Sequence, residues 1–265
     1  MNQHLSRAAL VVILALVLSC GASSRTPASK TLRVMTYNIH VGVGMDKKLD
    51  LQRIAGVINR EQPDLVGLQE VDRGVKRTEG KDEMAELAAM TRMNFAFAPN
   101  LDYQGGKYGV AILSRLPIKS ILHLMFENKR EAERRGMLKV EVDVHGTTVH
   151  FVTTHLDYQF EDGRLFEAEQ LLENLEGVAG PLIVVADLND TPTGSAYKLM
   201  RTLFDDAWIT SRAKGDGFSY PADKPVKRID HVFYRTGAGV RAKKAWVPET
   251  LASDHVPVVA TIEIR

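Results

Sequence analysis

The chain of 265 residues contains one cysteine, Cys20. A single cysteine excludes an intramolecular disulfide, so the folded part has to be stable through its hydrophobic core alone. The sequence also lacks the closely spaced cysteine and histidine ligands that zinc sites use, which argues against a zinc centre. Apolar residues make up 45% and charged residues 25% of the chain, as in a globular protein that can bury a sizeable core.

An excess of charge of one sign is also missing. Lys and Arg number 34, Asp and Glu number 33, and Arg7 is the one charged residue in residues 1–19, so the rest of the chain is formally neutral. Enzymes dedicated to nucleic acids usually carry a basic footprint that neutralises phosphates. The near-equal numbers of basic and acidic residues therefore argue against a dedicated DNA-binding protein. A neutral total charge is still compatible with a local basic stripe.

The longest apolar run lies at the N-terminus, where residues 8–18 are continuously apolar. This run is too short to span a bilayer comfortably and is typical of a secretory signal peptide. It ends at Val17-Leu18-Ser19-Cys20-Gly21, which resembles a bacterial lipobox, where the cysteine is lipidated. We predict a signal peptide over residues 1–19, lipidated Cys20 with a flexible tether over residues 20–31, and attachment to the bacterial cell envelope, on the periplasmic side or at the outer membrane. A simple signal peptide or an uncleaved anchor is the alternative.

Residues 32–265 contain no second linker, low-complexity tract or internal repeat, which predicts one domain. Helical spacing occurs around residues 51–58, 82–90 and 165–175, with Asp50 as the N-cap of the first helix and Pro63 after its end. The dipeptide His145-Gly146 predicts a hairpin turn. Mixed sheets covered by helices, an α/β fold, are therefore expected. Apolar runs typical of strands occur at residues 32–37, 65–69, 95–98, 110–113, 118–125, 137–144, 148–154, 182–186, 229–234 and 256–264.

Polar side chains follow several of these strands, at the point where the apolar run stops. Asp254 and His255 precede the last strand, and at such a junction both can reach one pocket from different directions. Asp187 and Asn189 would share a face if their strand persisted, so they could orient a water and hold a phosphoryl oxygen. An Asx turn that ends the strand is the alternative, and the following Thr191-Pro192-Thr193-Gly194 favours it.

Glu70 and Asn38 close two other apolar runs. An ionised glutamate beside a buried strand is costly unless it is paired or binds a metal. Carboxylate and amide oxygens suit a hard cation, so Mg²⁺ (or Mn²⁺) is the predicted cofactor.

His155 ends a strand with an imidazole, and Asp230 offers a carboxylate that can orient a histidine. A hydrogen-bonded structural histidine and a strand-end cap are the respective alternatives. His40 and His231 are predicted to be surface or structural residues. Lys129-Arg130 and Arg134-Arg135, interleaved with Glu131 and Glu133, predict a mixed-charge loop, which could still border the substrate.

Taken together and in order, these segments resemble the endonuclease/exonuclease/phosphatase family, which includes pancreatic-type deoxyribonuclease, AP endonuclease, neutral sphingomyelinase and inositol polyphosphate phosphatase. The resemblance runs from about residue 32 to the end. The matching stretches are Thr36-Tyr37-Asn38, Leu68-Gln69-Glu70-Val71, residues 108–115 (YGVAILSR), Thr154-His155-Leu156, Asp187-Leu188-Asn189, Arg228-Ile229-Asp230 and Ser253-Asp254-His255.

The resemblance implies a four-layer α/β sandwich, with two mixed, mostly antiparallel sheets packed face to face and helices outside. It also implies divalent-metal-dependent hydrolysis of a phosphoester by in-line attack of water. Glu70 would be the main metal ligand, with Asn38 and Asp254 lining the metal region. His255, held by Asp230, would act as general base or stabilise the transition state.

His155 would donate to the phosphate or protonate the leaving group. Asp187 would be the other candidate for activating water, with Asn189 orienting the phosphate. The sequence leaves the choice between Asp187 and His255 open.

Three hypotheses about the function follow. The first is a phosphodiesterase-type hydrolase at the envelope, acting as a monomer on a lipid head group, a phosphorylated small molecule or a nucleic acid. The second is an extracytoplasmic nuclease, which a basic groove beside the cleft would favour. The third is a non-catalytic binding lipoprotein, against which the intact set of acids and histidines argues.

Overall fold

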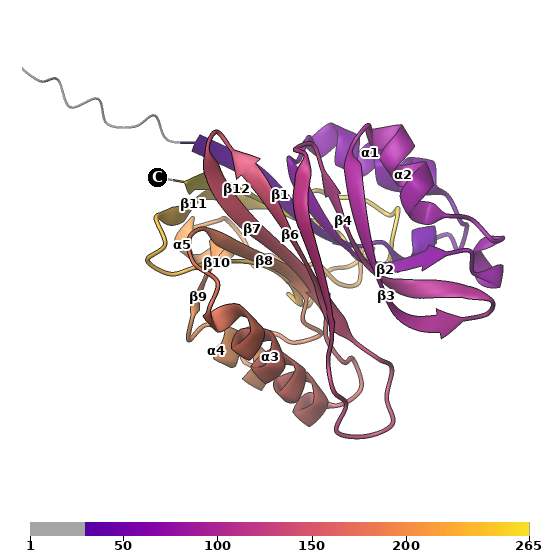
Figure 1. Ribbon diagram of the computed structural model, residues 1–265. Coiled ribbons are helices and arrows are strands. Elements are labelled where there is room, and N and C mark those ends of the chain that lie inside the picture. The colour runs from indigo at the N-terminus through magenta and orange to yellow at the C-terminus, as the bar shows by residue number, and fades with distance from the viewer. Residues whose placement is uncertain (1–29, 265) are drawn as a thin grey trace, which may run out of the picture.

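The computed structural model describes residues 30–264, which form two six-stranded sheets packed face to face with helices on both outer faces (Figure 1). The predicted four-layer α/β sandwich is confirmed. The predicted signal peptide and Cys20 lie outside the described residues. The first strand begins at Lys30, so the last two residues of the predicted tether belong to the sheet.

The two sheets have the same internal plan. In each, one pair of neighbouring strands is parallel, β1 with β2 and β7 with β8, and the other pairs are antiparallel. The first sheet has the order β11 (Val240–Trp246), β12 (Val258–Ile264), β1 (Lys30–Asn38), β2 (Leu65–Arg73), β4 (Gly106–Ser114) and β3 (Asn94–Tyr103). The second has the order β5 (Ile118–Met125), β6 (Gly136–Val144), β7 (Thr147–His155), β8 (Leu182–Asp187), β10 (Asp230–Arg235) and β9 (Phe204–Asp206).

The helices cover the outer faces of the sheets. Helices α1 (Leu51–Glu61) and α2 (Glu83–Thr91) lie against the first sheet, and α3 (Glu161–Glu176) and α4 (Ser195–Met200) lie against the second (Figure 1). The short α5 (Ala207–Thr210) lies beside β10 and β11, and two 3-10 turns are η1 (His40–Gly42) and η2 (Lys76–Thr78). One apolar cluster fills the space between the sheets and one lies under each helical layer. None of the helices in residues 30–264 is both apolar and long enough to cross a bilayer.

Local signals account for the elements that the sequence predicts. The Asp50 side chain accepts hydrogen bonds from the backbone N–H groups of Gln52 and Arg53, which caps α1. The helix ends at Glu61, and the left-handed Gln62 forms its C-cap directly before Pro63. In the β6–β7 hairpin, His145 and Gly146 both have positive φ (50° and 83°), as the predicted tight turn requires.

Several short or irregular elements have no clear sequence signal. The sequence predicts no strand at β9 or β11 and no helix at α4 or α5, because these elements are three to seven residues long or mix charged and apolar residues evenly. The last strand begins at Val258 rather than residue 256.

The two sheets approach each other closely at Gly67 of β2. A Cβ atom at Gly67 would lie 2.3 Å from Val185 Cγ2 and 2.6 Å from Thr153 Oγ1, so only glycine fits there. Two residues further along, the buried Gln69 donates from Nε2 to Thr36 Oγ1 (3.1 Å) and to Thr153 Oγ1 (2.9 Å). This contact joins the carboxyl halves of the two parallel strand pairs, so the side chains that follow these strands meet at one edge of the sandwich.

Candidate active site

A cavity of about 810 Å³ opens at this edge, and six of the eight predicted site residues line it. Asn38 and Asp230 are the other two, and they lie buried behind the cavity wall, where they contact residues that line it. The sequence prediction that side chains spread from Asn38 to His255 converge is therefore met by the geometry. The lining members of the predicted set are Glu70, His155, Asp187, Asn189, Asp254 and His255.

Glu70 reaches the cavity because β2 is irregular at this residue. Its φ is 57°, and the register between β2 and β4 shifts between Leu68 and Val71. A bulge of this kind re-aims a side chain, and the left-handed conformation of a non-glycine residue is strained unless its surroundings fix it. Gln69 thus points between the sheets while Glu70 faces the cavity.

The buried Asn38 at the end of β1 links two carboxylates. Its Nδ2 donates to Glu70 Oε1 (2.9 Å) and to Asp187 Oδ2 (3.0 Å), while its Oδ1 accepts from the backbone N–H of His40 (3.0 Å). The bond to His40 fixes which way the amide points. In this arrangement Asn38 orients Glu70 and Asp187, and its amide oxygen is already engaged.

Asp254 lies at the same end of the cavity, in the loop before β12. The hydroxyl of the buried Ser253 donates to the Asn38 carbonyl (2.8 Å), which joins this loop to the end of β1. His40 Nδ1 lies 3.8 Å from Asp254 Oδ1. His40 is predicted to be a surface or structural residue, but it also lines the cavity.

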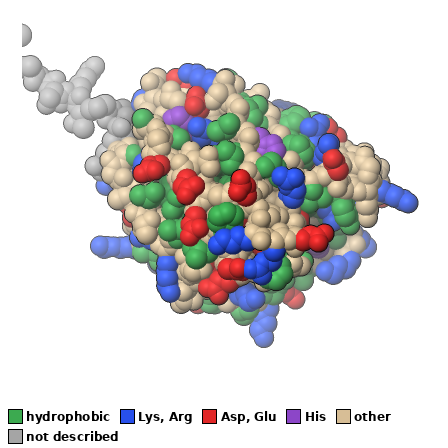
Figure 2. Space-filling model, turned by 60° about the horizontal axis from the view of Figure 1, so that its bottom comes forward, with side chains coloured by type: hydrophobic (Ala, Val, Ile, Leu, Met, Phe, Trp, Pro, Cys, Tyr) green, Lys and Arg blue, Asp and Glu red, His purple; other side chains and the backbone are tan. Residues whose placement is uncertain are grey.

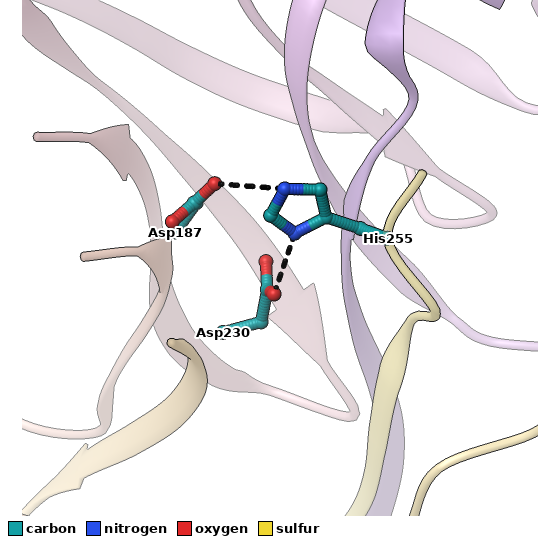
Figure 3. A group of neighbouring side chains, drawn as sticks. All are labelled: Asp187, Asp230 and His255. Carbon is teal, nitrogen blue, oxygen red and sulfur yellow. Dashed lines mark hydrogen bonds and ion pairs between the residues drawn. The ribbon is translucent and has the colours of Figure 1, made fainter. Parts of the chain in front are cut away.

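His255 lies between two buried carboxylates, as Figure 3 shows. Its Nδ1 donates to Asp230 Oδ2 (2.8 Å), and its Nε2 lies 3.7 Å from Asp187 Oδ2. Within residues 30–264, Asp187, Asp230 and His255 form a group whose ligand atoms lie within 4.8 Å of one another. The ring of Tyr220 packs against the imidazole, with centroids 4.8 Å apart.

The burial of this group changes its proton affinities. Burial lowers the pKa of His255, but the carboxylates of Asp230 and Asp187 raise it more, so the net pKa lies above the usual histidine range. Burial raises the pKa of Asp187, the carboxylate of Asp230 raises it further, and His255 opposes both. The imidazolium form of His255 is therefore favoured, and Asp187 holds a proton more readily than an exposed aspartate.

Asp187 and Asn189 meet through a turn rather than through strand alternation. The strand ends at Asp187, Asn189 has a φ of 50°, and the backbone N–H of Asn189 donates to Asp187 Oδ1 (2.9 Å). The shared face expected from a continuing strand is thus wrong, and the Asx-type turn is what forms. The turn still brings the Asn189 side chain into the cavity, where Nδ2 donates to the Leu156 carbonyl (3.0 Å).

His155 ends β7 and faces the same carboxylate from the second sheet. Its Nε2 lies 3.5 Å from Asp187 Oδ2 and 2.9 Å from Asn189 Nδ2, and its Nδ1 lies 2.9 Å from Arg135 Nη1. Arg135 is buried, so it is not a solvated member of a mixed-charge loop as the sequence predicts. Its ion pair with Glu133 (3.0 Å) resembles the surface pairs expected there, but nothing in the charge pattern indicates that its guanidinium turns inward.

The remaining cavity wall combines aromatic and charged side chains that are not among the eight predicted site residues. The guanidinium of Arg77 lies over the rings of Tyr103 (4.7 Å) and Tyr108 (5.1 Å), and the buried Asp72 holds it by two hydrogen bonds. This part of the wall therefore offers aromatic rings beside a cation that a buried carboxylate already pairs. Further charged lining residues are Glu133, Arg164, Asp190 and Lys227.

The donor set fits a hard divalent cation. Glu70 and Asp254 present carboxylates to the cavity, the hydrogen bond from Asn38 orients Glu70, and both are partly exposed, which leaves room for water ligands. A zinc site would require several histidine or cysteine ligands around one point, and the histidines near Asp187 are already engaged with other partners. Glu70 and Asp254 would therefore hold Mg²⁺ or Mn²⁺.

Comparison with known proteins agrees with this geometry. Residues 35–255 match the profile of the Endonuclease/Exonuclease/phosphatase family. The chain is 27% identical over 254 residues to the protein YbhP of Escherichia coli K12, covering 88% of this chain and 97% of YbhP. A solved structure from Enterococcus faecalis V583 has a TM-score of 0.75 at 20% identity, over 87% of this chain and 99% of that one. A mannosyl-6-phosphatase from Bacteroides thetaiotaomicron VPI-5482 has a TM-score of 0.72 at 18% identity, over 87% and 99%.

Proposed function

The chain belongs to the endonuclease/exonuclease/phosphatase family, whose members hydrolyse phosphoester bonds, and from this premise we propose that it is a divalent-cation-dependent phosphoester hydrolase. The observation that carries the proposal is the position of Asp187. Its carboxylate is buried and lies within 3.7 Å of donors from β1, from β7 and from the loop before β12: Asn38 Nδ2, His155 Nε2 and His255 Nε2. Such a preorganised set of donors and acids suits charge that develops on a phosphoryl group.

We propose that Asp187 accepts the proton of the attacking water. A group that already carries a proton cannot take another, and the two carboxylates beside His255 favour its imidazolium form. Burial raises the pKa of Asp187, which makes it a stronger base than an exposed aspartate. His255, held by Asp230, would then stabilise the negative charge on the phosphoryl oxygens, and Asn189 would orient the phosphate.

Glu70 and Asp254 would hold the cation, which would polarise a phosphoryl oxygen as a Lewis acid when bound. Asn38 would position Glu70 through the bond between Nδ2 and Oε1 (2.9 Å). Activity measured with each cation in turn distinguishes Mg²⁺ from Mn²⁺.

The substrate we propose is a phosphorylated small molecule. The cavity is lined both by acidic side chains, among them Glu133, Asp190 and Asp254, and by basic ones, among them Arg77, Arg164 and Lys227. Figure 2 likewise shows Lys and Arg side chains interspersed with Asp and Glu over the face in view, without a continuous basic stripe. A long nucleic acid needs such a stripe to neutralise successive phosphates, whereas a single phosphate needs one or two cations. One protein of the same fold is a mannosyl-6-phosphatase, which is named for a phosphorylated sugar.

An activity panel tests the proposed function. The chain from residue 21 onward is assayed with EDTA, Mg²⁺ or Mn²⁺ on bis-p-nitrophenyl phosphate, p-nitrophenyl phosphate, sugar phosphates, inositol phosphates, sphingomyelin and plasmid DNA. We expect metal-dependent release of phosphate or nitrophenol, and its loss in Asp187→Asn but not in the exposed control Asp216→Asn. Cleavage of plasmid DNA alone would support a nuclease instead. Metal-independent turnover, or none on any substrate, would contradict the proposal.

We also propose that the protein is an envelope lipoprotein that acts as a monomer. The support is the apolar run of residues 8–18 followed by Cys20 in a lipobox-like setting. Expression of the full chain in a bacterium, with palmitate labelling and fractionation, tests the anchor: Cys20→Ala should lose both the label and the membrane association. Labelling of the variant would contradict the assignment, and size-exclusion chromatography of the soluble form would test the monomer.

A further inference from the structure

The two histidines that face Asp187 have partners of opposite charge on their outer nitrogens. His255 Nδ1 lies 2.8 Å from a carboxylate oxygen of Asp230. His155 Nδ1 lies 2.9 Å from the guanidinium nitrogen Nη1 of Arg135. A carboxylate accepts, whereas a guanidinium donates only and stays charged. Nδ1 of His255 therefore carries a proton, whereas Nδ1 of His155 has to accept a hydrogen bond and carries none.

The fold places Arg135 beside His155. The arginine directly precedes β6, which pairs with β7 so that Met137 is opposite Thr154, and this register brings residue 135 alongside the end of β7. The Thr154 hydroxyl donates to the Gly136 carbonyl (2.9 Å), and the Arg135 carbonyl accepts from the Phe126 N–H (2.9 Å). Arg135 is 2% exposed, so its geometry toward His155 is fixed by the strands and not by solvent.

We propose that Arg135 is a positioning residue that holds His155 as the neutral tautomer with the proton on Nε2, so that His155 donates a hydrogen bond to the substrate phosphate and does not protonate the leaving group. That the bound group is a phosphate rests on the proposed function. The tautomer of His155 rests on the geometry alone. Because Nη1 can only donate, Nδ1 of His155 has to accept, and the single proton of the neutral ring lies on Nε2.

The surroundings of Nε2 indicate where this proton is directed. Asn189 Nδ2 lies 2.9 Å away but is itself a donor, and its bond to the Leu156 carbonyl (3.0 Å) fixes that orientation of the amide. Two donors thus converge on one point at the cavity wall, next to Asp187 Oδ2 at 3.5 Å from Nε2. Asp187 Oδ2 is the acceptor within reach of the Nε2 proton, and a phosphoryl oxygen that enters the cavity can accept from the same nitrogen.

The charges around His155 favour the same neutral form. The groups that face it are Arg135 from the loop before β6, Asp187 from β8 and His255 from the loop before β12. Burial, Arg135 and His255 hold the pKa of His155 well below its usual range. Arg135 keeps its own charge because Glu133 pairs with it (3.0 Å).

Nuclear magnetic resonance of the ¹⁵N-histidine-labelled chain tests the tautomer without reference to activity. The His155 signals are assigned by their absence in His155→Gln. We expect an unprotonated Nδ1 and a protonated Nε2 that stay unchanged between about pH 5.5 and 8, a range where an ordinary histidine titrates. Arg135→Met should give mixed tautomers, and Arg135→Lys, which keeps a charged donor, should preserve the native pattern. The exposed neighbour Arg134→Met is the matched control.

Kinetics provide the second readout. We expect Arg135→Met to lower kcat on the order of 100-fold, with KM little changed and with partial recovery in Arg135→Lys. A protonated Nδ1 in the native protein, or a native pattern in a folded Arg135→Met, would overturn the inference even if the enzyme is active. If Arg135→Met does not fold, the native spectrum and Arg135→Lys decide. The expected tautomer in a protein that hydrolyses nothing would leave this inference standing and refute the proposed function.

Discussion

Asp230 and His255 are 25 residues apart in the chain, yet Asp230 Oδ2 lies 2.8 Å from His255 Nδ1 with both side chains buried. The carboxylate comes from the start of β10 in one sheet, and the histidine comes from the loop that leads into β12 in the other. The pair therefore spans the two sheets at the edge where the cavity opens. It fixes the ring orientation and raises the pKa of the imidazole, against the lowering effect of burial.

Asp230→Asn should alter the orientation and the pKa of the His255 ring without changing the fold. The asparagine keeps the size of the side chain but removes the negative charge, so the pKa of His255 should fall and kcat should decrease on the order of 10²- to 10⁴-fold. A histidine titration by magnetic resonance and steady-state kinetics measure the two changes. Asp223→Asn, an exposed aspartate nearby, is the control. Native kcat together with a lowered pKa would show that the charge on His255 is not used in the reaction.

Glu70→Gln should weaken the binding of the divalent cation at least about tenfold, because it replaces the charged ligand with a neutral one while keeping its shape. Isothermal titration with Mg²⁺ and Mn²⁺ measures the affinity, and circular dichroism checks the fold. The exposed Glu79→Gln, in the loop after the same strand, should bind the cation as the native chain does. Equal affinity in Glu70→Gln would move the cation site elsewhere, with Asp254 and Asp187 as the next carboxylates to change.

The sequence predicts the fold where a local pattern is strong. The caps at Asp50, the hairpin at His145-Gly146 and the apolar strands of the core all form as expected, because each depends on residues close to one another in the chain. The weakly patterned β9, β11, α4 and α5 owe their structure to contacts with distant elements, such as the pairing of β11 with β12. Propensity alone does not contain such contacts.

The residues of the candidate site also differ in how far the sequence predicts their positions. The strand-end positions of Asn38, His155 and Asp187 follow from their place after apolar runs, whereas β2 continues past Glu70 to Arg73. The bulge at Glu70 is not predicted, because it depends on a positive φ in a residue that rarely adopts one, whereas the turn at Asn189 is the Asx-turn alternative that the following residues favour. The inward turn of Arg135 is also set by the pairing of β6 with β7, and a charge-rich loop gives no sign of it.

Glu83 at the start of α2 should make the stability depend on pH. It is buried, its Oε2 accepts from the Asp72 N–H (2.8 Å), and burial raises its pKa from 4.5 to about 8, an effect that this hydrogen bond only partly opposes. The folded state thus binds the proton more tightly than the unfolded state. The stability contributed by the protonated form is fully present below about pH 4.5 and is lost as the pH rises through about 8.

Glu83→Gln removes this titration and retains an oxygen that can accept from Asp72. We expect the variant to gain free energy of unfolding relative to the native chain as the pH rises from 5 to 9, by at most about 4 kcal/mol. Urea unfolding at several pH values measures the difference. The exposed Glu86→Gln in the same helix should show no such trend. A constant difference between native and Glu83→Gln across this range would mean that Glu83 is ionised in the folded protein.

Gly67→Ala should test whether the close approach of the sheets supports the cavity. The added Cβ would lie 2.3 Å from Val185 Cγ2 and 2.6 Å from Thr153 Oγ1, so β2 and the second sheet have to separate. Overpacking of this kind costs about 1–3 kcal/mol of unfolding free energy. The separation should also lengthen the Gln69–Thr153 bond (2.9 Å) and displace Glu70 relative to Asp187, so activity should fall more than the loss of stability explains. Gly56→Ala, in α1 with open space around it, should be neutral or stabilising in urea unfolding and unchanged in kinetics. Full activity in a folded Gly67→Ala would show that the two halves of the site tolerate a shift between the sheets.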